Sequence, residues 1–191
     1  MCLSLIDALE EAWRRAQTVL DLGRVATYIP ELAKADPSRL GVVVYSGSAT
    51  RAAVGDTATP FTLQSVAKVI ALTLALWRLG PEPVLDRVGM EPTGEPFNSL
   101  AKLESTGESG PLNPMINSGA IAVCGLLVEN MGYAAAWREL TYLAGRMCAP
   151  GFFGINEAVY RSEEATAHRN RAMAHLLRDL DILRVSAEET V

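Results

Sequence analysis

The apolar run from Val66 to Leu79 constrains this chain more than any other stretch of its sequence. A helix needs about 20 apolar residues to cross a bilayer. The run is shorter than that, so we expect a buried core helix. Pro60 stands where we expect this helix to begin, because the first helical turn does not use the N–H that proline lacks. Gly80, followed by a proline, supplies a stop signal at its end.

Two polar residues, Ser65 and Lys68, stand at the start of this run. Three positions apart on a helix, their side chains share a face and come within reach of each other. In this arrangement a neutral lysine amine can take the proton from a serine hydroxyl, and burial together with the helix dipole disfavours the charged amine. The same spacing occurs at Ser99 and Lys102. The alternative is a polar Ser65 in the first turn and a Lys68 that extends to the surface.

The composition excludes several classes of protein. With 191 residues, of which 49% are hydrophobic and 20% charged, the chain reads as one soluble globular domain or little more. The net charge of −5 and the scattered arginines argue against a nucleic-acid partner. The three cysteines are widely spaced and the two histidines have no cysteine pair nearby, which argues against a metal site or a Ser-His-Asp triad. The first residues do not resemble a secretory signal, so we expect a cytoplasmic protein without a membrane partner.

The rest of the chain is mostly helical in pattern. We expect helices over residues 3–20, 84–88, 98–103, 133–148 and 168–183, a buried helix from residue 115, and a further polar segment that Asn156 opens. The convincing strands cover residues 40–45 and 49–54, with a turn at 46–48. The fold class is therefore α+β. A two-stranded sheet is marginal by itself, so the hairpin is expected to join more strands or to pair with another chain.

Several short segments follow one another in a characteristic order: Gly23–Ala33, Gly55-Asp56, Pro60–Lys68, Gly89–Gly94, Pro96–Leu100, Asn113–Ala120, Asn156–Glu163 and Arg169–Ala174. Together they resemble the serine-dependent glutaminase family, which shares the fold of serine β-lactamases and penicillin-binding proteins. The resemblance runs from about residue 20 to the end of the sequence. It favours Ser65 and Lys68 over Ser99 and Lys102, since the second pair lies outside the matched catalytic pattern.

The resemblance implies hydrolysis of L-glutamine to L-glutamate and ammonia through an acyl-serine intermediate, without a cofactor or a metal. It makes Ser65 the nucleophile and Lys68 its base. The positions that it implies for substrate binding are Tyr28, Gln64, Asn117, Glu163 and Asn170. Their chemistry agrees, because a carboxylate suits the α-ammonium of glutamine and asparagine amides both donate and accept hydrogen bonds.

Taken singly, these residues also have ordinary explanations. Asn117 fits the N-cap of the helix that follows it, and Glu163 fits a solvated helix residue. Asn170 fits a surface residue, and Tyr28 fits a core aromatic residue whose hydroxyl is satisfied.

By the resemblance, family members continue well past the last residue of this sequence. Their continuation carries two tyrosines and a Lys-Ser/Thr-Gly-like strand that completes the oxyanion hole, and no lysine follows Lys102 here. We therefore expect residues 1–191 to be a single incomplete catalytic domain that lacks the C-terminal strands, and a homo-oligomer, either a dimer or a tetramer. The alternatives are another acyl-serine hydrolase of this fold, or an inactive helical fragment that associates with itself.

Overall fold

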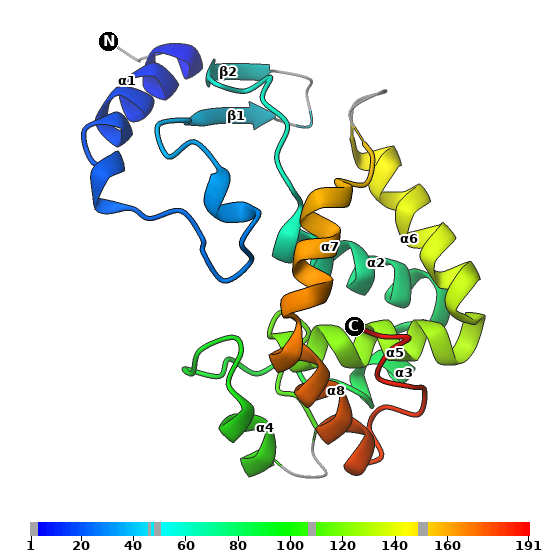
Figure 1. Cartoon of the computed structure of the whole chain (residues 1–191). Helices are drawn as coiled ribbons and strands as arrows, with labels where there is room; N and C mark the ends of the chain where they lie inside the picture. Colours follow the sequence, from blue (N-terminus) through cyan, green and yellow to red (C-terminus); the bar gives the residue numbers. More distant parts are fainter. Residues whose placement is uncertain (1–3, 46, 48–50, 107–109, 149–152) are drawn as a thin grey trace. The chain divides into compact units, whose positions relative to one another are not determined.

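The computed structural model describes residues 4–45, 47, 51–106, 110–148 and 153–191. These residues form two compact units, which Figure 1 shows with their helices and strands labelled. The first unit consists of Met1–Phe61 and Asn156–Thr166, and the second of Thr62–Ile155 and Ala167–Val191. The division does not follow the chain order, because a short C-terminal segment belongs with the N-terminal residues.

The first unit contains a helix packed on a two-stranded hairpin. Its elements are α1 (Leu5–Gln17), the 3₁₀ turns Leu20–Leu22 and Leu32–Lys34, β1 (Gly41–Tyr45), β2 (Arg51–Gly55) and α7 (Glu157–Thr166). β1 and β2 pair antiparallel, with Gly41 opposite Gly55 and Tyr45 opposite Arg51. The predicted hairpin and the α+β class are thereby confirmed. The predicted turn at 46–48 falls largely outside the described residues.

Sequence signals account for how α1 begins and where it docks. Ser4 and Asp7 form a capping box, in which the Ser4 hydroxyl accepts from the Asp7 N–H and the Asp7 carboxylate accepts from the Ser4 N–H. Trp13 on α1 donates from Nε1 to the Leu40 carbonyl at 3.0 Å, which ties the helix to the hairpin. Gly55 has φ +77°, and a Cβ there would lie 2.2 Å from the Leu40 oxygen, so only glycine fits this close approach.

α7 begins at a side-chain cap, and one of its side chains joins it to the rest of the first unit. The Asn156 side chain accepts from the Val159 N–H at 3.2 Å, which confirms that Asn156 opens this segment. On the same helix the Ser162 hydroxyl accepts from the Glu31 N–H at 3.2 Å. This bond joins α7 to a segment 131 positions earlier in the chain.

The second unit is a helical bundle built around α5. Its elements are a 3₁₀ turn (Gln64–Val66), α2 (Ala67–Leu79), α3 (Pro81–Leu85), α4 (Leu100–Thr106), α5 (Asn117–Met131), α6 (Tyr133–Met147) and α8 (His168–Asp179). α2, α6 and α8 all pack against α5, as Figure 1 shows. Fully buried side chains on α2, α5 and α8, including Leu74, Leu127 and Met173, fill the space between them. Each such side chain contributes about 1.5–3 kcal/mol to folding.

The apolar run is confirmed as a core helix, but its predicted start is wrong. α2 begins at Ala67, and the chain at Pro60 has no regular structure. Gln64 has φ +46°, a left-handed conformation that an α-helix cannot continue through. The helix therefore starts only after the 3₁₀ turn. Its end is as predicted, with Gly80 at φ +83° as the C-cap.

Two short helices also differ in position from their predicted ranges. The helix expected at 84–88 lies at Pro81–Leu85, because Pro81 serves as its first residue. The helix expected at 98–103 lies at Leu100–Thr106. The later helices end within a few residues of their predicted bounds, as is usual for boundaries read from sequence.

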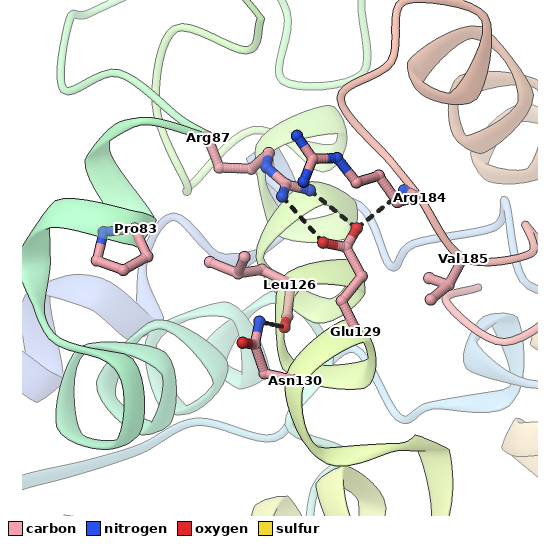
Figure 2. Close-up of a pocket in the computed structure, with 7 residues that line it drawn as sticks. All are labelled: Pro83, Arg87, Leu126, Glu129, Asn130, Arg184 and Val185. Carbon is pink, nitrogen blue, oxygen red and sulfur yellow. Dashed lines mark hydrogen bonds and ion pairs between the residues drawn. The ribbon is translucent and has the colours of Figure 1, made fainter.

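A buried ion pair holds the segment after α8 against α5 (Figure 2). The Arg87 guanidinium donates twice to the Glu129 carboxylate, both times at 2.9 Å, and once to the Ile182 carbonyl. The Arg184 N–H also donates to Glu129, at 2.8 Å. Burial raises the pKa of Glu129, but the hydrogen bonds and charges of Arg87 and Arg184 outweigh it, so that this pKa is below its ordinary value. Arg87, Glu129 and Arg184 line an open pocket of about 550 Å³.

Candidate active site

Ser65 lies in the 3₁₀ turn that leads into α2, and its side chain is exposed. The residue before it, Gln64, is one of two non-glycine residues with positive φ among those that the structure describes. A glutamine is uncommon in this left-handed region, and such strain is concentrated at functional sites. The turn thus places the exposed Ser65 just before the start of the core helix α2.

Lys68, in the first turn of α2, is half-buried and held by two acceptors. Its Nζ donates to the Asn117 Oδ1 at 2.7 Å and to the Met115 carbonyl at 3.0 Å. The same nitrogen lies 5.4 Å from the centre of the Phe97 ring. Burial lowers the pKa of Lys68 from its ordinary value of 10.5. The surroundings therefore favour the neutral amine that base chemistry needs, and a lysine that extends freely to the surface is not what the structure has.

Asn117 connects Lys68 to Asn170. Its Oδ1 accepts from Lys68, and its Nδ2 donates to the Asn170 Oδ1 at 2.9 Å. Asn117 is not the N-cap of α5, because Ile116 takes that position and makes no side-chain cap. The side chain is instead used for these two contacts, across 49 and 53 positions of sequence. Asn170, on α8, is likewise half-buried rather than a plain surface residue.

We expected the side chains of Ser65 and Lys68 to come within reach of each other, but no hydrogen bond joins them in the described second unit. The hydrogen bonds of Lys68 Nζ there go to Met115 and Asn117 instead. Catalytic hydrogen bonds are often long in proteins without bound substrate and shorten when it binds. The two residues lie three positions apart, Ser65 in the 3₁₀ turn and Lys68 in the first turn of α2.

Tyr28 and Glu163 belong to the first unit. Tyr28 is 65% exposed, so its alternative as a core aromatic residue is wrong. Glu163 is half-buried on α7. Among the seven predicted site residues, the structure thus joins Lys68, Asn117 and Asn170 by hydrogen bonds.

Three features of the site were missed by sequence reasoning: the Met115 carbonyl, the Phe97 ring and the side chain of Asn113. Phe97 and Asn113 lie within segments that carried the family resemblance, which marked them without giving them a role. A contact made by a backbone carbonyl has no signature in residue types. The side chain of Lys102, in the competing pair, lies outside the described residues.

No group of three or more His, Cys, Asp or Glu residues in the described segments could hold a metal ion. No single described helix is long and apolar enough to cross a membrane; α5 and α6 meet that test only as a pair, and they are bent by 118° at their junction.

Comparison with known proteins identifies the family. The family model described as Glutaminase matches residues 23–191. Glutaminase 1 of Halalkalibacterium halodurans is 41% identical over 183 residues, which are 96% of this chain and 59% of that protein. A glutaminase of Alkaliphilus metalliredigens is 44% identical over 166 residues, which are 87% of this chain and 54% of that one. The chain therefore spans little more than half the length of these relatives.

A solved structure shows the same fold. It is the covalent complex of the Bacillus subtilis glutaminase YbgJ with 5-oxo-L-norleucine, formed by reaction with 6-diazo-5-oxo-L-norleucine. It matches with a TM-score of 0.79 and 30% identity, over 98% of this chain and 57% of that one. The α+β architecture is thus that of the β-lactamase-like fold of bacterial glutaminases. This chain belongs to the glutaminase family.

Proposed function

We propose that this chain carries the nucleophile and base of an L-glutamine amidohydrolase. The observation that supports it best is the placement of Lys68, half-buried and hydrogen-bonded to Met115 and Asn117, one helical turn from Ser65. Because burial lowers the pKa of Lys68, the amine can accept the hydroxyl proton of Ser65. Family membership supports this reaction, and the positions of Ser65 in the 3₁₀ turn and Lys68 at the start of α2 support the choice of these two reacting groups.

The chemistry would run in two steps. Ser65 Oγ attacks the side-chain carbonyl carbon of glutamine while its proton passes to Lys68, and the tetrahedral intermediate collapses when that proton reaches the departing ammonia. Water then attacks the acyl-serine ester, one of its protons passes by way of Lys68 to Ser65 Oγ as the ester bond breaks, and glutamate leaves. Backbone N–H groups at the start of the core helix, including that of Ser65, suit the oxyanion.

The remaining predicted residues would hold the substrate. Glu163 suits the α-ammonium of glutamine, and Tyr28 and Gln64 suit its polar groups. Asn117 already uses its amide on Lys68 and Asn170, which orients Asn170 through its Oδ1 and leaves the Asn170 Nδ2 available to a substrate carboxylate. A substrate that leaves such groups unpaired would be rejected.

The wider setting of the proposal is a cytoplasmic homo-oligomer, a dimer or tetramer, that acts on a small molecule without nucleic acid or a membrane. The hairpin, whose sheet has two strands in the part of the chain that the structure describes, supports self-association through its strand edges. The family's relatives are longer, and their additional length would supply the expected C-terminal strands.

Glutamate release from glutamine tests the proposal, on this chain and on a version extended to the length of the relatives. We expect Ser65→Ala to abolish release and Ser99→Ala, the matched control with the same Ser-x-x-Lys spacing, to leave it unchanged. Peptide mass spectrometry after treatment with 6-diazo-5-oxo-L-norleucine should show a covalent adduct on Ser65. Absence of release and of adduct from both lengths of chain would contradict the proposal.

A further inference from the structure

The Lys68 amine has two hydrogen-bond acceptors, and they differ in origin. One is the Asn117 side chain on α5, and the other is the backbone carbonyl of Met115 in the loop before that helix. A neutral lysine amine has two N–H groups and one lone pair. If both N–H groups point to these acceptors, the lone pair takes the remaining tetrahedral direction, so the acceptors determine where the base points.

The direction of the Met115 carbonyl depends on the turn that precedes it. Within this turn the Asn113 Oδ1 accepts from the Met115 N–H at 3.0 Å and from the Ile116 N–H at 3.3 Å. Such Asx contacts fix the peptide planes that they bind. The Met115 carbonyl and the Ile116 N–H belong to the same planar peptide group, so the bond that Asn113 accepts from the Ile116 N–H also restricts the direction of the carbonyl.

Asn113 is itself anchored on its other side. Its Nδ2 donates to the Glu91 carbonyl at 2.8 Å, and the Glu91 N–H donates to the Leu112 carbonyl at 2.9 Å. These bonds tie the turn to the segment that ends in Phe97, whose carbonyl accepts from the Asn117 N–H at 2.8 Å and whose ring faces Lys68. Asn113 is therefore linked by hydrogen bonds to both segments that contact the Lys68 amine, the one that contains Met115 and the one that ends in Phe97.

The backbone of α5 packs closely against this turn. A Cβ added at Gly119 on α5 would lie 2.0 Å from the Asn113 carbonyl oxygen, so the two backbones are in close contact. Pro114, the next residue, has its φ fixed by its ring. The turn is thus supported from three directions, by α5, by the Glu91 segment and by its own side-chain bonds.

We propose that Asn113 is a positioning residue for Lys68, which acts by holding the Met115 carbonyl against the amine and so aims the lone pair of the base at Ser65. The inference rests on the proposed function for its catalytic consequence. Its structural part, the placement of the Lys68 amine by Asn113, can be measured without any turnover.

The first measurement follows the amine directly. Lys34, Lys68 and Lys102 are the only lysines, so protein labelled with ¹³C at the lysine ε-carbon gives three signals, which Lys34→Arg and Lys102→Arg assign. We expect Asn113→Ala to shift the Lys68 signal and Asn113→Ser, whose hydroxyl can accept in the same turn, to restore part of the shift. Asn130→Ala is the matched control, because Asn130 also binds a carbonyl of the second unit, that of Leu126 at 2.8 Å, near the other end of α5.

The second measurement is kinetic, on whichever length of chain releases glutamate. Misplacement of a catalytic group by about 1 Å costs up to 10²-fold in rate. We expect Asn113→Ala to lower kcat about 10- to 100-fold relative to Asn130→Ala, with KM changed less than threefold. Asn113→Ser should recover part of the rate.

The outcomes separate the two proposals. An unmoved Lys68 signal in a folded Asn113→Ala variant would overturn the positioning role even if glutamate release remains established. A moved signal with kcat equal to that of Asn130→Ala would overturn its catalytic consequence. A moved signal in a chain that neither releases glutamate nor forms the Ser65 adduct at either length would support the positioning of the amine while the proposed function fails.

Discussion

At the scale of single residues, the site depends on a lysine that is kept from full contact with water. Two oxygen acceptors would by themselves favour the charged form of Lys68, and burial opposes them. Burial lowers the pKa of Lys68 from its ordinary value. The acceptors then contribute orientation, which is what a base needs once it is neutral.

The lowered pKa of Lys68 predicts how activity depends on pH. The neutral fraction of the amine grows as pH rises through this pKa, so kcat/KM for glutamine should rise with pH and level off below 10.5, the ordinary lysine value. Lys68→Arg, which stays charged, should lose about 10²–10⁴-fold, the usual worth of a general base. Lys34→Arg serves as the control, and a wild-type profile that falls with rising pH would contradict the assignment.

Asn117 offers a sharper test of the same balance. Asn117→Asp keeps the shape of the side chain but places a carboxylate where Oδ1 now lies 2.7 Å from Lys68 Nζ. An opposite charge at that distance favours the ammonium and raises its pKa by about 1–3 units. We therefore expect the rising limb of the pH profile to move to higher pH by a similar amount, measured as kcat/KM between pH 6 and 10. An unshifted limb would show that another group limits the rate.

At the scale of helices and segments, the Arg87–Glu129 pair joins α5 to a distant part of the chain, as Asn117 does. We expect the ion pair to contribute to stability, whereas the contacts of Asn117 build the site. The side chains of Arg87 and Glu129 are only 12% and 13% exposed. Removing one partner from a buried pair leaves an uncompensated charge, which costs more than the pair itself contributes. The Arg78–Glu139 pair between α2 and α6 is more open, at 44% and 23% exposed.

These two pairs predict unequal losses of stability. Glu129→Gln should lower the free energy of unfolding by about 3 kcal/mol at pH 7, because it breaks a buried network. The control, Glu139→Gln, should cost less than about 1 kcal/mol, as partly exposed pairs do. Urea denaturation followed by circular dichroism measures both losses. Equal losses would contradict the larger contribution to stability that we expect from the network around Glu129.

The same comparison has a pH dependence with a defined sign. Since the pKa of Glu129 is lower in the folded protein than in the unfolded chain, the unfolded state takes up this proton first as pH falls. The stability that Glu129 contributes is complete above its ordinary pKa of 4.5 and is lost as pH falls through the folded value. The gap between wild type and Glu129→Gln should therefore close in acid.

Local signals predicted much of the element pattern but not the details that build the site. Nearly continuous apolar runs located α2 and α5, yet the start of α2 depends on the left-handed Gln64, which no propensity reveals. Asparagine is a common N-cap residue, so the sequence suggests that role for Asn117. Only its tertiary contacts with Lys68 and Asn170 show that the side chain is used differently. Resemblance to a family could select such residues. It could not show which of them contact each other, because those contacts span about 50 positions of sequence.

At the scale of the whole molecule, the hairpin of the first unit sets an expectation about assembly. The sheet has two strands, so each strand has an edge of unpaired backbone groups in the described chain. On β1 the exposed residues alternate with half-buried ones, and Val43 and Tyr45 on the outward face are 50% and 72% exposed. We expect an exposed strand of this kind to be able to pair with a second copy.

We therefore expect self-association that depends on the hairpin. Val43→Lys should shift the chain toward monomer, because a charge on the outward face opposes strand pairing and stacking, and sedimentation velocity over a range of concentrations measures the shift. Trp77→Lys is the control from the other unit, since Trp77 on α2 is also exposed, at 66%. If Trp77→Lys dissociates the assembly and Val43→Lys does not, the helical surface is the interface. A wild-type chain that stays monomeric at all concentrations would contradict self-association altogether. Ser65→Ala should leave the assembly unchanged, since Ser65 lies in the second unit and not in the hairpin.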